Sequence, residues 1–182
     1  MSTNESPRYR LFVPAAAFAL AATIAASPRQ ALPPAKVDPA IMAKSVGDMT
    51  ADEELQFSDA AEATIRRVCV TCHPVEVVVK TRRTAREWND QVTTMRGRGA
   101  AGSDQDFAAI DKYLTRYFGV VHVNTATAEE LTSVLGLSSR DARAVVEYRG
   151  AHGNFADLAA LERVPGVDKA KLDDQPEALR FD

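Results

Sequence analysis

Five consecutive residues, Cys69-Val70-Thr71-Cys72-His73, constrain this chain more than any other feature of its sequence. Two thiols at this spacing can add across the two vinyl groups of a haem, and the adjacent histidine can reach the iron from the same face. A zinc site would need a second pair of ligands, and the chain has only 2 cysteines. A redox dithiol is expected within a βαβ pattern, which the sequence lacks. We therefore predict one covalently attached haem c, bound through Cys69, Cys72 and His73.

The second axial ligand of the iron is predicted to be Met95, the only methionine after the cysteine motif. A thioether at this position would complete His/Met ligation, so that His73 and Met95 would be the two metal ligands. A methionine on an apolar stripe can instead be an ordinary core residue. His122 is a rival ligand and His152 a weaker one.

The first 27 residues have the pattern of an export signal. Arg8 and Arg10 precede an uncharged, apolar run of 16 residues from Leu11 to Ala26. Such a run is short for a membrane span and suits a signal peptide, with an uncleaved signal anchor as the alternative. This pattern predicts a protein of the periplasm or of the outer face of the cytoplasmic membrane, with membrane attachment possible through the N-terminal segment. Residues 28–50 contain four prolines and are predicted to be a linker.

The rest of the sequence predicts two small helical domains, 51–119 and 120–182, and an all-α fold. In the first domain, Ser58 is expected to begin a helix that leads directly into Cys69, and Thr84 to begin a helix with a capping box. A third helix is expected after Ser103. The apolar stripes of the three helices are, in order, Ala61, Ile65 and Val68; Trp88, Val92 and Met95; and Phe107, Ile110, Leu114 and Tyr117.

Residues 51–119 resemble a small class I-type cytochrome c domain. The run from Arg83 to Trp88, followed by Val92 and Met95, is similar to haem domains of quinohaemoprotein dehydrogenases and related bacterial electron carriers. The resemblance implies that Met95 is the axial ligand. We also predict that Trp88 and Arg83 contact the cofactor.

Basic residues are concentrated in the same domain, with a local net charge of +4 between residues 80 and 98. Such a cluster can form a docking face for an acidic redox partner, can neutralise the haem propionates through one or two arginines, or can be a solvated helix face. The basic residues are Lys80, Arg82, Arg83, Arg86, Arg96 and Arg98.

Residues 120–182 resemble the helix-hairpin-helix domain of the competence DNA receptor ComEA, through the run from Val123 to Leu131 and the later Val164-Pro165-Gly166-Val167. The resemblance implies two tandem hairpins whose Gly-hydrophobic-Gly turns present backbone N–H groups to phosphate. In this chain Ser138 and Asp168 replace the second glycine of the two turns, and the segment carries a net charge of −4. We therefore predict a docking domain for a protein partner and argue against DNA.

Together these features predict an exported c-type cytochrome that transfers electrons as a carrier or as a subunit of a larger redox complex. Its partner would be a redox protein or a membrane electron-transfer complex. No acid–base pair or nucleophile constellation stands out, so we expect an electron-transfer protein and no enzyme. Two alternatives remain: a haem-bearing DNA-binding protein of the ComEA-like type, and a haem sensor with an open iron site.

Overall fold

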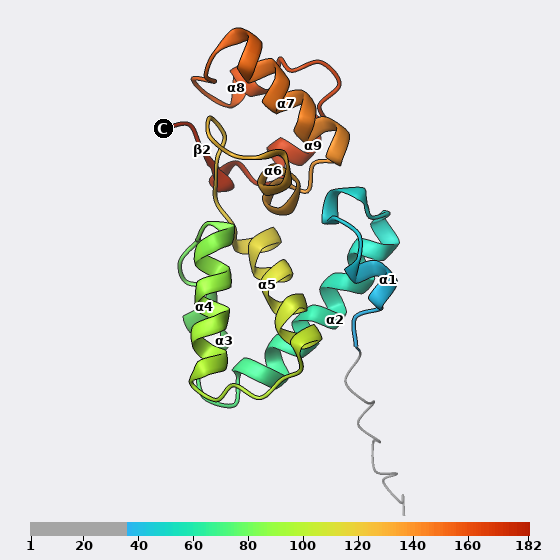
Figure 1. Ribbon diagram of the computed structural model, residues 1–182, viewed down its shortest axis with the longest axis vertical. Helices are drawn as coiled ribbons and strands as arrows, with labels where there is room; N and C mark the ends of the chain where they lie inside the picture. Colours follow the sequence, from blue (N-terminus) through green and yellow to red (C-terminus); the bar gives the residue numbers. More distant parts are fainter. Residues whose placement is uncertain (1–35) are drawn as a thin grey trace, which may run out of the picture. The chain divides into compact units, whose positions relative to one another are not determined.

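Helices dominate the computed structural model of the chain, which describes residues 36–182 (Figure 1). The N-terminal group of elements consists of α1 (Pro39–Met42), the short 3-10 helix η1 (Val46–Asp48), α2 (Ala51–Cys69), α3 (Val75–Val79), α4 (Ala85–Gly97) and α5 (Asp104–Phe118). The C-terminal group consists of β1 (Val121–His122), α6 (Ala128–Leu135), α7 (Ser139–His152), α8 (Leu158–Leu161), α9 (Lys169–Asp173), the 3-10 helix η2 (Pro176–Ala178) and β2 (Leu179–Arg180). The prediction of a mainly helical fold is confirmed.

The predicted signal, residues 1–27, and the first part of the predicted linker lie outside the described residues. Within residues 36–182, no helix combines the length and the apolar character that crossing a membrane requires.

Two helices, α4 and α5, begin where the sequence predicts, and α6 begins with the same kind of cap. Thr84 and Glu87 form a capping box before α4, in which the Thr84 backbone N–H donates to the Glu87 carboxylate at 2.8 Å. Thr127 and Glu130 do the same before α6, and Ser103 begins α5. Each box satisfies N–H groups that have no partner within the first helical turn, which is why these starts can be found from sequence.

The start of α2 differs from the prediction. Thr50, not Ser58, begins this helix, and it forms a capping box with Glu53. Ser58 lies inside the helix, where its hydroxyl donates to the Leu55 carbonyl at 3.0 Å. The apolar stripe of Ala61, Ile65 and Val68 is buried as predicted. The helix therefore still leads directly into Cys69, but it begins earlier in the chain than predicted.

The described part of the predicted linker is folded. Val37, Ile41 and Val46 are buried and pack against Phe57 of α2 in a cluster that also contains Ala109 of α5. The prolines in this segment wrongly indicate a linker. Pro39 occupies the first position of α1, where its missing N–H costs nothing. Val37, Ile41 and Val46 consequently belong to the core that packs against α2 and α5.

The N-terminal helices share a second cluster beside the cysteine motif. Ile65 and Val68 of α2, Trp88 of α4, and Phe107 and Ile110 of α5 are buried together. This cluster forms the wall of the cavity described below.

Two tight hairpins build the C-terminal group. The α6–α7 turn passes through Gly136 at φ +65°, and the α8–α9 turn passes through Gly166 at φ +82°. Such left-handed conformations favour glycine, so the glycines fix both turns. The core of this group includes Leu131, Leu135 and Val145.

One feature of the C-terminal group has no counterpart in the predicted all-α fold. Val121–His122 and Leu179–Arg180 pair as two parallel strands, with Val121 opposite Leu179. Strands of two residues are too short to show the alternating pattern by which strands are predicted. The pairing ties the end of the described chain to the segment that follows α5.

Candidate functional site

One cavity of about 250 Å³ brings together five of the six residues predicted to bind a cofactor. It lies between α2, α4 and α5, and the five are Cys69, His73, Arg83, Trp88 and Met95. Cys72 is exposed and lies instead in a shallow neighbouring pocket, which shares His73 with the cavity. The apolar wall, which sequence reasoning named only in part, is formed by Val68, Val77, Val78, Val92, Ala100, Phe107, Ile110 and Leu114.

The His73 ring is held in one orientation by the residue that follows it. Its Nδ1 lies 3.1 Å from the Pro74 carbonyl oxygen. A carbonyl oxygen can only accept, so this contact requires the proton on Nδ1 and leaves the Nε2 lone pair available. Histidines that bind metals are commonly oriented in this way.

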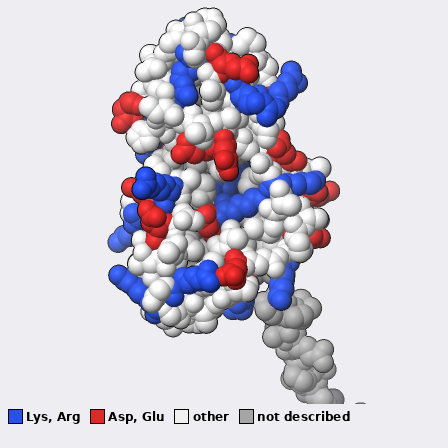
Figure 2. Space-filling model, in the orientation of Figure 1, with Lys and Arg blue, Asp and Glu red and all other residues white. Residues whose placement is uncertain are grey.

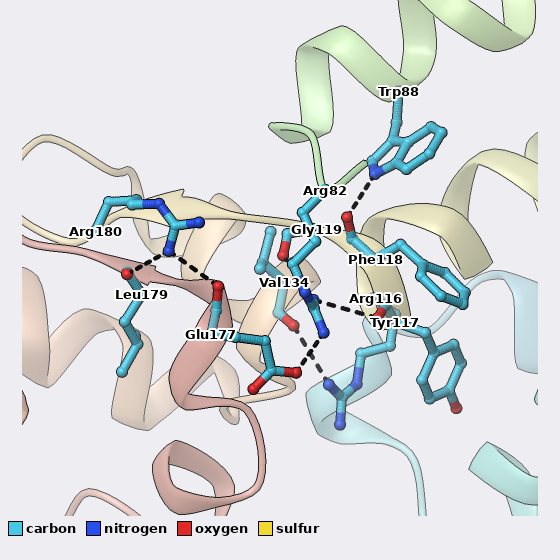
Figure 3. Close-up of polar contacts among 10 residues, drawn as sticks. All are labelled: Arg82, Trp88, Arg116, Tyr117, Phe118, Gly119, Val134, Glu177, Leu179 and Arg180. Carbon is cyan, nitrogen blue, oxygen red and sulfur yellow. Dashed lines mark hydrogen bonds and ion pairs between the residues drawn. The ribbon is translucent and has the colours of Figure 1, made fainter. Parts of the chain in front are cut away.

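Trp88 and Arg83 line the cavity in different ways. The Trp88 ring is fully buried, and its Nε1 donates to the Phe118 carbonyl at 2.9 Å (Figure 3). The Arg83 guanidinium carbon lies 5.6 Å from the centre of the Trp88 ring. Arg83 Nε is buried and has no hydrogen-bond partner within residues 36–182. A buried donor without a partner is costly, so this atom suits an acidic group of a ligand in the cavity.

Met95 lines the cavity from α4, but the two rival histidines do not. His122 pairs with Asp182, with 3.0 Å between Nδ1 and the carboxylate. His152 stacks on the Tyr148 ring at the end of α7. The described residues contain no group of three or more His, Cys, Asp or Glu side chains that could hold a metal ion.

Burial separates the two cysteines. Cys69 is partly buried at the end of α2, and this burial raises the pKa of its thiol. In the chain without a bound group, the Cys69 thiol is thus kept protonated at neutral pH.

The basic residues between 80 and 98 do not form one open docking face. Arg82 pairs with Glu177 and donates to the Gly119 carbonyl at 3.1 Å (Figure 3). Arg96 pairs with Asp104 at 2.5 Å, and Arg98 lines the cavity. Several of these side chains therefore have structural contacts within the fold.

The two hairpin turns lead into helices whose first N–H groups already meet oxygen atoms. Ser138 caps α7, its hydroxyl accepting from the Asp141 N–H at 3.1 Å. The backbone N–H of Ser139, the first residue of α7, donates to the Asp48 carboxylate at 3.0 Å. At the second turn the Asp168 carboxylate accepts from the Ala170 N–H at 3.1 Å and caps α9. Asp48 was not among the residues predicted from the sequence.

The basic side chains of the hairpin region fall into two groups. Arg149 donates to the Val123 and Ala126 carbonyls, Arg180 to the Glu177 and Leu179 carbonyls, and Lys171 lies 3.4 Å from the Glu54 carboxylate. The other group is exposed and has no hydrogen bond or ion pair within the described part of the chain. It consists of Arg140, Arg143, Arg163 and Lys169, which we call the hairpin basic group.

Comparison with known proteins identifies the class of the C-terminal region. Residues 117–180 match the helix-hairpin-helix motif family. An uncharacterized protein of Haemophilus influenzae is 39% identical over 62 residues, which are 34% of this chain and 55% of that protein. The mouse endonuclease/exonuclease/phosphatase family domain-containing protein 1 is 45% identical over 53 residues, 29% of this chain and 9% of the mouse protein.

ComE operon protein 1 of Bacillus subtilis is 32% identical over 54 residues, 30% of this chain and 26% of that protein. The aligned segments thus span little more than half of the Haemophilus protein and much less of the other two. No solved structure matches the chain.

These matches correct the predicted function. They support the ComEA-like helix-hairpin-helix region and not a cytochrome, so the prediction of a haem electron carrier docked to a redox protein partner is wrong. The prediction that argued against DNA is also wrong, because residues 117–180 match the helix-hairpin-helix motif family and are similar to ComE operon protein 1.

The error has a physical cause. The net charge of −4 over residues 120–182 does not say where the charges lie, and Arg140 and Lys169 are exposed beside the second turn. On the face drawn in Figure 2, acidic and basic side chains are interspersed rather than separated by sign. The exposed basic group near the turns therefore describes the hairpins better than the sum over 120–182 does.

Proposed function

We propose that this protein binds duplex DNA through its helix-hairpin-helix region. The observation that carries the proposal is an anion at the hairpin itself: the α7 N-terminus, directly after the Gly136 turn, holds a carboxylate through the Ser139 N–H. Backbone N–H groups at a helix N-terminus bind phosphate by the same chemistry. The helix-hairpin-helix match over residues 117–180 and the similarity to ComE operon protein 1 support the same conclusion.

The second hairpin offers the more accessible contact with phosphate. Pro165 and Gly166 are exposed at its turn, and an Arg140 guanidinium nitrogen lies 3.9 Å from the place where a Gly166 side chain would begin. Lys169, the first residue of α9, follows the turn. Arginine and lysine beside an exposed backbone turn can neutralise DNA phosphates without reading the bases. We therefore expect binding that depends little on sequence.

We further propose that the cavity holds one haem c, bound covalently through Cys69 and Cys72. His73 Nε2 and the Met95 thioether would bind the iron, Trp88 would form an apolar wall, and Arg83 Nε would donate to a propionate. The cavity fits this group because it is apolar over most of its wall and contains one buried donor without a partner. When bound, the haem would supply an iron centre whose properties would depend on the side chains that hold it.

Haem c attachment takes place outside the cytoplasm, so we place the protein in the periplasm or at the outer face of the cytoplasmic membrane. DNA that reaches that compartment is then the proposed partner. We assign no reaction to the protein, which we regard as a haem-bearing DNA-binding protein rather than an enzyme.

Salt-dependent duplex binding tests this function. The full chain is expected to retain duplex DNA at low salt, and neutralisation of about three phosphates by the hairpin basic group predicts a slope of roughly −3 in log K against log salt. A variant in which Arg140, Arg163 and Lys169 are all changed to Ala should lose most of that slope. Absence of retention by the wild-type chain at about 50 mM salt would refute DNA binding.

A further inference from the structure

The first hairpin turn is covered by a segment of the same chain. Gly47 of η1 approaches the turn so closely that a side chain on it would begin 1.8 Å from the Leu137 carbonyl oxygen. On another side, the Arg116 guanidinium lies 2.8 to 2.9 Å from where a Gly136 side chain would begin. Gly136 and Leu137 are accordingly buried, in contrast to the exposed Pro165 and Gly166 of the second turn.

The covering segment also delivers a negative charge to the hairpin. Asp48, next to Gly47, accepts the Ser139 backbone N–H at 3.0 Å and the Ser139 hydroxyl at 2.5 Å. These two hydrogen bonds, with the nearby Arg143 charge, hold the pKa of the Asp48 carboxyl below its ordinary value. The carboxylate is therefore charged at neutral pH, and it meets the positive end of a helix of 14 residues.

We propose that Asp48 is an internal phosphate mimic: its carboxylate occupies the anion position of the first hairpin, so that η1 keeps this hairpin closed to DNA until it is displaced. The proposal rests on the DNA-binding function proposed above. In the second hairpin, α9 is capped by Asp168 of the same turn, and this hairpin contacts DNA first. A backbone phosphate can then compete with Asp48 for the Ser139 groups.

The contact has the properties of a displaceable cover. Asp48 is exposed, so solvent and ions reach its carboxylate. An exposed carboxylate that caps a helix contributes little to the free energy of folding, and competition by phosphate is correspondingly easy. Val46, by contrast, is buried against α2 and α5, which keeps the segment near the hairpin when the carboxylate is released.

Inorganic phosphate tests the anion position without DNA. In the full chain, the Ser139 amide NMR signal is followed during a phosphate titration at constant ionic strength. Asp48→Ala should give a saturable shift at a lower phosphate concentration than the wild-type chain and Asp52→Ala, which removes a neighbouring exposed acid, because in these two chains phosphate must displace the Asp48 carboxylate. Asp48→Asn keeps the shape of the side chain and serves if the alanine variant fails to fold. No shift in either Asp48 variant, or a shift at the same phosphate concentration in the wild-type chain, overturns the proposal.

Duplex DNA tests the closure. Asp48→Ala should bind duplex about tenfold more tightly than the wild-type chain, as one regained phosphate contact predicts, and Asp52→Ala less than about threefold more tightly. Equal gains in the two variants would show that only net charge matters and would overturn the closure. If no variant binds DNA, the proposed function fails, and the phosphate titration alone decides whether Asp48 occupies an anion site.

Discussion

The Asp48 carboxylate accepts both the backbone N–H and the hydroxyl of Ser139, a residue 91 positions later in the chain. This contact joins η1, in the segment 28–50 that contains four prolines, to the first residue of α7. We therefore expect part of the stability of the fold to depend on the charge of this exposed carboxyl group.

The stabilisation by Asp48 is expected to depend on pH. Because the pKa of the folded state is lower than the ordinary value of 3.8, the contribution is present above that value and is lost as pH falls through the folded pKa. At pH 7, Asp48→Ala should lower the free energy of unfolding by about 0.5–1 kcal/mol, as for a lost helix cap. Urea unfolding at about pH 2.5 should show a much smaller difference. A difference that persists there would contradict the ionic contribution.

Arg116 should be the arginine whose loss destabilises the fold most. Its side chain is only 5% exposed, and it contacts the Glu54 carboxylate at 3.2 Å and the Val134 carbonyl at 3.3 Å. Arg116→Met leaves a half-buried carboxylate and a buried carbonyl without this donor, at a cost of about 3 kcal/mol. Arg66→Met, which removes an exposed pair with Glu62, should cost less than about 0.5 kcal/mol. Equal urea midpoints for the two variants would contradict this assignment.

Arg140 is expected to contribute to DNA affinity through charge and not through the fold. Arg140→Ala should weaken duplex binding for all sequences tested and reduce the magnitude of the salt slope by about 1. Arg86→Ala, a change of another exposed arginine on α4, is the control and should leave affinity unchanged within about twofold. If both variants lose affinity equally, the contact with DNA does not lie at the hairpins.

Met95 is expected to determine the spectrum of the bound haem but not its attachment. After expression with haem attachment, Met95→Ala should keep the covalent haem, because Cys69, Cys72 and His73 are unchanged. It should lose the absorption band that reports sulfur–iron ligation and should bind carbon monoxide readily. Met49→Ala changes a half-buried methionine outside the cavity and should retain the wild-type spectrum. An unchanged spectrum in Met95→Ala would refute Met95 as the ligand.

Local signals in the sequence were sufficient for much of the helical fold. The capping boxes at Thr84 and Thr127 and the left-handed turn at Gly136 depend on residues within a few positions of one another. The same kind of signal was present at Thr50 and Glu53, but the prolines before them favoured a linker. Proline at a helix start carries no such penalty, and the burial of Val37, Ile41 and Val46 could not be foreseen without their partners in α2 and α5.

The two candidate sites differ in how far the sequence predicts them. The cavity residues from Cys69 to Met95 come from neighbouring helices, and five of the six predicted residues line one cavity. Asp48 reaches the hairpin only through tertiary structure, and no local pattern marks it. The net charge of the hairpin segment is a poor guide for a related reason, because a sum over residues cannot distinguish Arg149, which donates to two carbonyls, from exposed Arg140.

Gly47 has an ordinary backbone conformation, and its restriction comes from the Leu137 and Gly136 carbonyls. In a saturation mutagenesis screen, position 47 should therefore reject even alanine, although neither its torsion angles nor its partial exposure would mark it as sensitive. Tolerance at this position would report directly on whether η1 rests on the hairpin. If cells supplied with DNA tolerate side chains at position 47 and cells without DNA do not, η1 moves away from the first hairpin when DNA binds.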